Sequence, residues 1–195
     1  MMAAHLNDFP HHRYTLEEYF ALERVGEARY EYWDGNILCM SGGTERHYII
    51  TDNVYLTLSR LLQDGSCRAF SAGAPIKTQF LPPYRYPDTS VVCGKPLFVN
   101  INGIDVLTNP VLIVEVLSPG TEHLDKEEKR NAYQRIPSLK EYVIISQDAP
   151  HLTRYRRQGR RWARQDVGDL NGSLELTSIE SEILISEIYG SVSFS

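Results

Sequence analysis

An apolar run bounded by prolines constrains this chain more than any other segment. Residues 110–119 read PVLIVEVLSP. A short apolar run between such breaks is typical of a strand covered on both faces, as in the centre of an α/β sheet. Glu115 lies in the middle of the run. A buried carboxylate is costly unless it is paired, hydrogen-bonded or bound to a cation, so Glu115 is either half of a structural ion pair or part of a functional site.

The segments around this run predict a mixed α/β fold with helices packed on a central sheet. Thr15 and Glu18 form a capping-box pattern that starts a short helix. Asp34-Gly35, between two strand-forming runs, predicts a β-hairpin. The other expected elements are helices at 44–64, 121–136 and 183–189, strands at 67–70, 76–80, 88–93, 142–146 and 174–179, a two-stranded ribbon at 151–165 and a loop at 97–109.

Length and composition predict one soluble domain. The chain has 195 residues, of which 42% are hydrophobic, so one core can form without metal or disulfide staples. We expect a leader at 1–13 and a single domain at 14–195. The apolar stretches are too short to cross a bilayer, and the start does not resemble a secretory signal. The three cysteines (Cys39, Cys67 and Cys93) are interpreted as buried, unpaired thiols in a reducing cytoplasm.

The charge distribution is uneven. The net charge of -5 argues against a protein that coats nucleic acid non-specifically. Residues 151–165 nevertheless contain no acid and six arginines, which are Arg154, Arg156, Arg157, Arg160, Arg161 and Arg164. This basic ribbon predicts either a contact with phosphates or an acidic partner, or a solvated hairpin that pairs with acids of the same or a second subunit.

Two further acids lie where they could join Glu115. Asp88 follows Pro87 at the head of a predicted strand, and Glu31 lies in the first hairpin. If the strands of Asp88 and Glu115 are neighbours, two carboxylates meet at one edge of the sheet and repel unless a cation lies between them. Oxygen ligands of this kind suit Mg²⁺ or Mn²⁺. The alternatives are that Asp88 only caps a turn and that Glu31 is exposed and idle.

A lysine is expected near these acids. Lys129 shares one face of the helix that follows Glu115 with Asp125 and Tyr133, because the three are four residues apart. A lysine beside a metal-bound water can orient the water or stabilise negative charge. The alternative is a solvated pair between Lys129 and Asp125.

Six motifs in order resemble one family. P-D at 87–88, E-V-L-S-P at 115–119, D-x-x-x-K-x-x-x-Y at 125–133 and E-Y-V-I-I at 141–145 resemble the Uma2 family of the PD-(D/E)XK nuclease superfamily. The stretches YTLEEY and YEYWDGNILCMSG resemble its N-terminal signature. The likeness covers about residues 14–188, and its strength lies in the order of motifs that are individually weak.

The resemblance implies a restriction-endonuclease-like core and a divalent-metal site. Asp88 matches the aspartate of the P-D motif, Glu115 the acid of the second motif and Glu31 an upstream glutamate of the family. The lysine expected two residues after the acid is replaced by Leu117, and Lys129 resembles a migrated substitute. The remaining matches, placed around the site without a fixed role, are His47, Asp125 and Tyr133.

The implied function is a metal-dependent endonuclease that hydrolyses phosphodiester bonds in nucleic acid. Asp88 and Glu115 would hold Mg²⁺ or Mn²⁺, and Lys129 would position water or phosphate. DNA is the expected substrate and a homodimer the expected assembly, whereas the choice between DNA and RNA and any sequence preference stay open. Two alternatives remain: a catalytically inactive nuclease-fold module for binding or dimerisation, and a glycoside hydrolase that uses a carboxylate pair.

Overall fold

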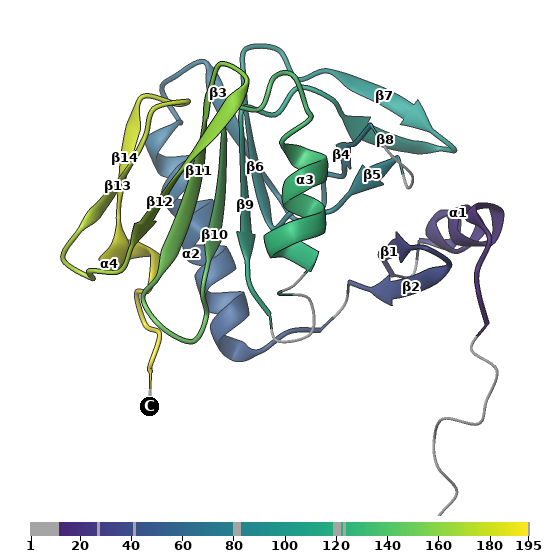
Figure 1. Cartoon of the computed structure of the whole chain (residues 1–195), viewed down its shortest axis with the longest axis horizontal. Coiled ribbons are helices and arrows are strands. Elements are labelled where there is room, and N and C mark those ends of the chain that lie inside the picture. Colours follow the sequence, from purple (N-terminus) through teal and green to yellow (C-terminus); the bar gives the residue numbers. More distant parts are fainter. Residues whose placement is uncertain are drawn as a thin grey trace, which may run out of the picture. The chain divides into compact units, whose positions relative to one another are not determined.

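The structure of this protein is a computed structural model (Figure 1) that describes residues 12–26, 28–40, 42–79, 83–118, 122 and 124–194. The chain divides into two compact units, one up to residue 41 and the other from residue 42. Each unit is described by itself. The expected leader lies outside the described residues except for its last two, and the expectation of one domain at 14–195 stays a prediction.

Within the described residues of the first unit, one helix and one hairpin form, as predicted. Helix α1 (Leu16–Val25) begins with the capping box, in which the backbone N–H of Glu18 donates to Thr15 Oγ1 at 3.2 Å. Strands β1 (Tyr30–Trp33) and β2 (Asn36–Cys39) pair in antiparallel register. Their turn residues Asp34 and Gly35 have φ values of 44° and 84°, the left-handed region that this tight turn requires.

A six-stranded mixed sheet forms the centre of the second unit. Its strand order is β12-β11-β10-β9-β6-β3, and only β9 and β10 run parallel. Every residue of β9 is buried, so the prediction of a central strand covered on both faces is confirmed, as is the mixed α/β class. The strands are β3 (Cys67–Ser71), β6 (Thr89–Cys93), β9 (Leu112–Val116), β10 (Glu141–Ile145), β11 (Leu152–Gln158) and β12 (Arg161–Val167).

Helices cover the two faces of this sheet. Helix α2 (Glu45–Leu61) buries Ile50, Val54 and Leu58 in a core that also includes alternate residues of β9 and β10. Strands β13 (Ser173–Leu176) and β14 (Ser181–Leu184) and helix α4 (Ile185–Ile188) complete that core. The opposite face is covered by a π-helical turn, η1 (Leu124–Lys129), that continues into α3 (Arg130–Tyr133). Figure 1 shows α2 behind the sheet and α3 in front.

Some expected elements differ in extent. The prediction of a loop at 97–109 is wrong, because β7 (Phe98–Ile101) and β8 (Ile104–Leu107) form a hairpin there. Its turn is Asn102-Gly103, with φ values of 52° and 91°. This dipeptide is itself a strong hairpin signal, and it was available in the sequence. The hairpin belongs to a second sheet, β5-β4-β8-β7, with β4 at Ile76–Lys77 and β5 at Tyr84–Arg85.

The cysteine prediction is wrong. Cys67 and Cys93 lie directly opposite each other in the β3–β6 register and form a disulfide, while Cys39 is exposed rather than buried. Spacing along the chain did not reveal this pair, because it depends on strand register. Within the described part of the chain, no helix is long and apolar enough to cross a membrane. A cytoplasmic location stays a prediction.

Candidate active site

Strand register brings Asp88 beside Glu115. Strands β6 and β9 are antiparallel, and Thr89 pairs with Val114. Continuing this register by one residue places Asp88 opposite Glu115, and opposite residues of an antiparallel pair project from the same face. The backbone N–H of Val116 also donates to Asp88 Oδ2 at 2.7 Å. Two acids that are 27 positions apart in the chain therefore share one edge of the sheet.

Glu115 is the centre of a buried polar cluster. Its Oε1 lies 3.3 Å from Lys129 Nζ and accepts a hydrogen bond from the hydroxyl of Tyr133 at 3.0 Å. Lys129 Nζ also lies 3.0 Å from Asp125 Oδ1. The side chains of Lys129, Glu115 and Asp125 are at most 4% exposed. The shared face expected for Asp125, Lys129 and Tyr133 thus points to Glu115.

The π-helical turn positions two members of this cluster. Asp125 and Lys129 both belong to η1, and the hydroxyl of Tyr142 on β10 donates to the backbone carbonyl of Asp125 at 2.9 Å. A π-helical turn is rare and frequently marks a functional site, because it displaces side chains from their ordinary helical positions. Tyr142 was predicted only as part of an apolar strand, since an alternating pattern does not show what its hydroxyl reaches.

His47 contacts Asp88 from the other layer. It lies in the first turn of α2, where its backbone N–H donates to Thr44 Oγ1 at 3.1 Å. Its Nε2 lies 3.6 Å from Asp88 Oδ2. Burial alone would lower the pKa of His47. The nearby Asp88 carboxylate, with smaller contributions from the Val116 backbone and Asp125, outweighs burial and raises the pKa of His47.

The acids act together on one buried phenol. The pKa of Tyr142 is raised well above 10, first by burial and then by the charges of Glu115, Asp125 and Asp88. The site therefore gathers three carboxylates near this phenol, and Lys129 Nζ lies close to two of them, Glu115 and Asp125. Two carboxylates on one sheet face are an oxygen donor set that fits Mg²⁺ or Mn²⁺, with water and substrate oxygens as further ligands. Among the described residues, no three His, Cys, Asp or Glu side chains are grouped as metal ligands.

The six arginines of the predicted ribbon differ in their burial and contacts. Arg154 is buried, lies 3.4 Å from Glu141 Oε1 and donates to the Glu175 carbonyl and Gln165. Arg157 donates to the carbonyls of Gln134 and Ile136, each at 2.8 Å. These two arginines are engaged inside the fold. Of the other four, Arg156 is half-buried and the exposed ones are Arg160, Arg161 and Arg164.

Comparison with known proteins decides the family. The family model Uma2, described as "Putative restriction endonuclease", matches residues 16–185. The chain belongs to the Uma2 family. Two uncharacterized proteins of Synechocystis sp. are each 29% identical to it, one over 99% of this chain and 100% of the relative, the other over 84% and 92%.

A solved structure shows the same fold. It is described as a "putative nuclease" from Anabaena variabilis, and it matches this Uma2 chain with a TM-score of 0.66 over 84% of this chain and 90% of that one. At 17% identity the match shows the fold alone. The resemblance inferred from the sequence motifs is confirmed at the level of family and fold.

The structure shows the surroundings of two motif positions of this Uma2 chain, Leu117 and Lys129. Leu117, at the usual lysine position, is buried in the apolar core on the α3 side of the sheet. The nearby cation is Lys129, which approaches Glu115 from the covering helical segment. Glu31 is buried in β1 of the first unit, so its assignment to the site stays a prediction.

Proposed function

We propose that this Uma2 protein is a divalent-metal-dependent endonuclease that hydrolyses phosphodiester bonds in nucleic acid, with DNA as the expected substrate. One observation carries the proposal. Lys129 Nζ, an ammonium group, lies 3.3 Å from Glu115, and strand register places Glu115 beside Asp88. Membership of the Uma2 family supports the same class of reaction.

Each side chain has a role that its contacts support. Asp88 and Glu115 would hold Mg²⁺ or Mn²⁺, and the bound ion would polarise the scissile phosphate and lower the pKa of a water ligand. Lys129 donates toward the water or a phosphate oxygen and stabilises negative charge there. Tyr133 and His47 are positioning residues, because they contact Glu115 and Asp88 respectively.

A second candidate, a nuclease-fold module that binds or dimerises without cleaving, is favoured by one observation. The Lys129 side chain is only 2% exposed and lies close to two acids, Glu115 and Asp125. A buried ion cluster of this kind can be purely structural. The glycoside hydrolase alternative is less well supported. A carboxyl group that must donate a proton is poorly served by a neighbouring ammonium ion.

A cleavage assay separates these functions. Single- and double-stranded DNA and RNA are incubated with the protein and Mg²⁺, Mn²⁺ or a chelator. We expect metal-dependent cleavage that falls about a hundredfold or more in Asp88→Asn and Glu115→Gln, because each loses charge stabilisation at the reacting phosphate. Asp52→Asn, on the exposed side of α2, is the matched control. Cleavage that persists in the chelator would contradict the proposal, and Mn²⁺ binding without cleavage of any substrate would favour the inert module.

A further inference from the structure

A cavity lies on the same face of the sheet as Glu115. Glu115 pairs with Ile144 of β10, and Ile144 pairs with Thr153 of β11. Ile144 and Thr153 both line a cavity of about 420 Å³. Since neighbouring strands lie about 4.8 Å apart, this cavity begins one strand from Glu115 and reaches Thr153 at about 10 Å.

The π-helical turn separates the cavity from the Glu115 cluster. Asp125 and Lys129 of this segment are buried beside Glu115, whereas Lys126 and Arg130 line the cavity. One short segment therefore supplies a lysine to the candidate active site and two cations to the space next to it. Arg164 of β12 adds a third cation from the opposite wall.

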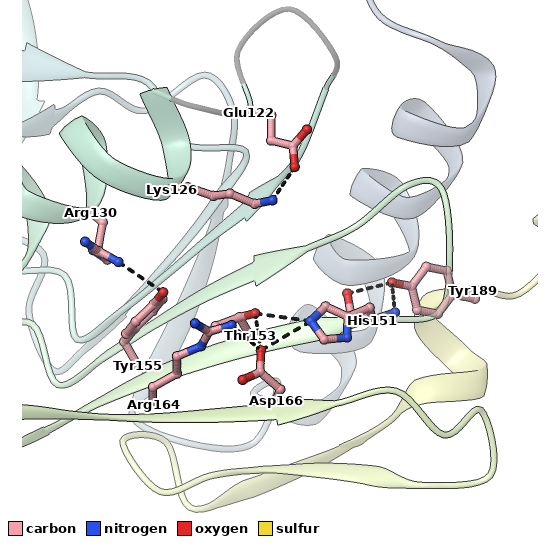
Figure 2. A network of polar contacts seen from close by, with 9 residues as sticks. All are labelled: Glu122, Lys126, Arg130, His151, Thr153, Tyr155, Arg164, Asp166 and Tyr189. Carbon is pink, nitrogen blue, oxygen red and sulfur yellow. Dashed lines mark hydrogen bonds and ion pairs between the residues drawn. The ribbon is translucent and has the colours of Figure 1, made fainter.

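The present contacts of these three cations leave them able to bind an anion (Figure 2). Arg130 donates to the hydroxyl of Tyr155 at 3.1 Å and lies 5.2 Å from its ring centre, so the side chain of Tyr155 positions its guanidinium. Lys126 pairs with Glu122 and Arg164 with Asp166, but all four side chains are between 39% and 60% exposed. Exposed pairs of this kind are weak and exchange readily with a competing anion.

The shape and charge of the cavity fit a phosphodiester. Its lining includes two buried apolar side chains, Leu117 and Ile144. The hydrogen-bond donors Lys126, Arg130 and Arg164 also line it. Two acids, Glu122 and Glu127, also line it, which disfavours a free dianion held by charge alone. A singly charged phosphate that is anchored elsewhere, as in a strand that already occupies the Glu115 site, needs only a few such donors.

We propose that this cavity is a phosphate subsite for the nucleic-acid strand, holding a phosphate adjacent to the one that faces Glu115. Lys126, Arg130 and Arg164 contact the phosphate oxygens, and Tyr155 positions Arg130. The strand as ligand rests on the proposed function, and the same chemistry would also serve the phosphate of a free nucleotide.

Binding measured in a chelator tests the subsite without cleavage. The affinity for a short single-stranded oligodeoxynucleotide is measured by fluorescence anisotropy over a series of salt concentrations. Each lost phosphate contact lowers the slope of log affinity against log salt by about 0.7 for a single strand. We expect that loss in Arg130→Gln and about twice that loss in Lys126→Gln with Arg130→Gln. Arg130→Lys keeps the charge and should keep the slope.

Controls and outcomes separate this inference from the proposed function. Lys95→Gln removes an exposed charge at the far end of β6 and should leave the slope unchanged. A methylphosphonate at one position of the oligonucleotide should lower the slope of the wild type by the same amount and leave the slope of Arg130→Gln unchanged.

A slope unaffected by Arg130→Gln in a protein that still cuts DNA would overturn only the subsite. The expected slopes without any cleavage would overturn only the nuclease. Displacement of the strand by a deoxynucleoside monophosphate, with no methylphosphonate effect, would assign the cavity to free nucleotides and overturn the strand as ligand.

Discussion

Two buried carboxylates of the same sheet, Glu141 and Glu115, have different surroundings. Glu141 on β10 accepts from the backbone N–H of Ser178 at 2.8 Å and lies 3.4 Å from Arg154, so one cation and several donors balance one acid. The ammonium of Lys129 lies 3.3 Å from Glu115 and 3.0 Å from Asp125, and Glu115 lies at the strand end that also carries Asp88. Acids gathered in one buried place are costly for folding and useful for cation binding.

The first prediction concerns the ammonium group that lies close to both Glu115 and Asp125. Lys129→Ala removes the cation between Glu115 and Asp125, so the free energy of unfolding should fall by about 3–5 kcal/mol in the absence of metal. If Lys129 serves water and phosphate, turnover should fall more than Mn²⁺ affinity. Urea denaturation, calorimetry with Mn²⁺ and the cleavage assay measure the three quantities. The exposed Lys95→Ala is the control, and an equal loss of turnover and affinity would show that Lys129 serves the metal instead.

At single positions the sequence indicated which residues belong to the polar cluster better than it indicated which residues they contact. Glu115 stands out because a charge interrupts an apolar run, and Lys129 because its spacing places it with Asp125 and Tyr133. The contacts of His47 with Asp88 and of Tyr142 with the Asp125 carbonyl depend on how layers stack. No local pattern encodes that stacking, which is set by packing between segments far apart in the chain.

At the scale of elements, hydrophobic pattern and turn chemistry predicted most of the helices and strands. The central strand, the capped helix α1 and the Asp34-Gly35 hairpin are confirmed because each has a local physical cause. The helix expected at 121–136 became a π-helical turn and a short α-helix, since the same spacing of buried side chains is compatible with both. Pairing between strands, including the cross-strand cysteines, was beyond local reasoning.

The second prediction concerns the disulfide between β3 and β6. It closes a loop between Cys67 and Cys93, whose sequence separation is 26. Replacing both by serine should lower the free energy of unfolding by about 2–4 kcal/mol, because the unfolded chain regains conformational freedom. Urea denaturation with and without a thiol reductant measures this. The reductant should destabilise the wild type and Cys39→Ser and leave the double variant unchanged; a wild type that ignores the reductant would contradict the expectation.

The third prediction concerns the connection between β10 and β11. The buried hydroxyl of Tyr189 donates to the carbonyl of Ser146 at 2.8 Å and accepts from the backbone N–H of His151 at 3.0 Å. Tyr189→Phe leaves these backbone groups without that partner and should cost about 1–3 kcal/mol at neutral pH. The exposed Tyr48→Phe is the control.

This connection also predicts an alkaline pH dependence. Burial raises the pKa of Tyr189 to about 12, although its hydrogen bond with the His151 backbone opposes the shift. The folded state therefore holds this proton more tightly than the unfolded state, whose pKa is about 10. The stability that Tyr189 contributes is complete below pH 10 and is lost as the pH rises toward 12. Urea denaturation between these values should show a smaller loss for Tyr189→Phe than for the wild type, and equal losses would contradict it.

At the scale of the whole molecule, charge is segregated. The chain carries -5, yet the β11–β12 hairpin holds six arginines, of which Arg154 and Arg157 are engaged within the fold. Since the acidic remainder repels phosphates, binding to nucleic acid outside the candidate active site should be confined to the hairpin and the neighbouring cavity. This repulsion acts over about 8 Å at physiological salt, so it limits where a strand can approach.

The last prediction tests that confinement. Arg160 and Arg161 lie at the exposed end of the hairpin, outside the cavity that contains Arg164. If each contacts one phosphate, Arg160→Gln with Arg161→Gln should lower the slope of log affinity against log salt by about 1.8 for a duplex. Lys77→Gln with Lys95→Gln removes the same charge from exposed positions elsewhere and should leave the slope unchanged. If both double variants changed the slope equally, net charge rather than the hairpin would control binding, because only a localised contact distinguishes two proteins of identical charge.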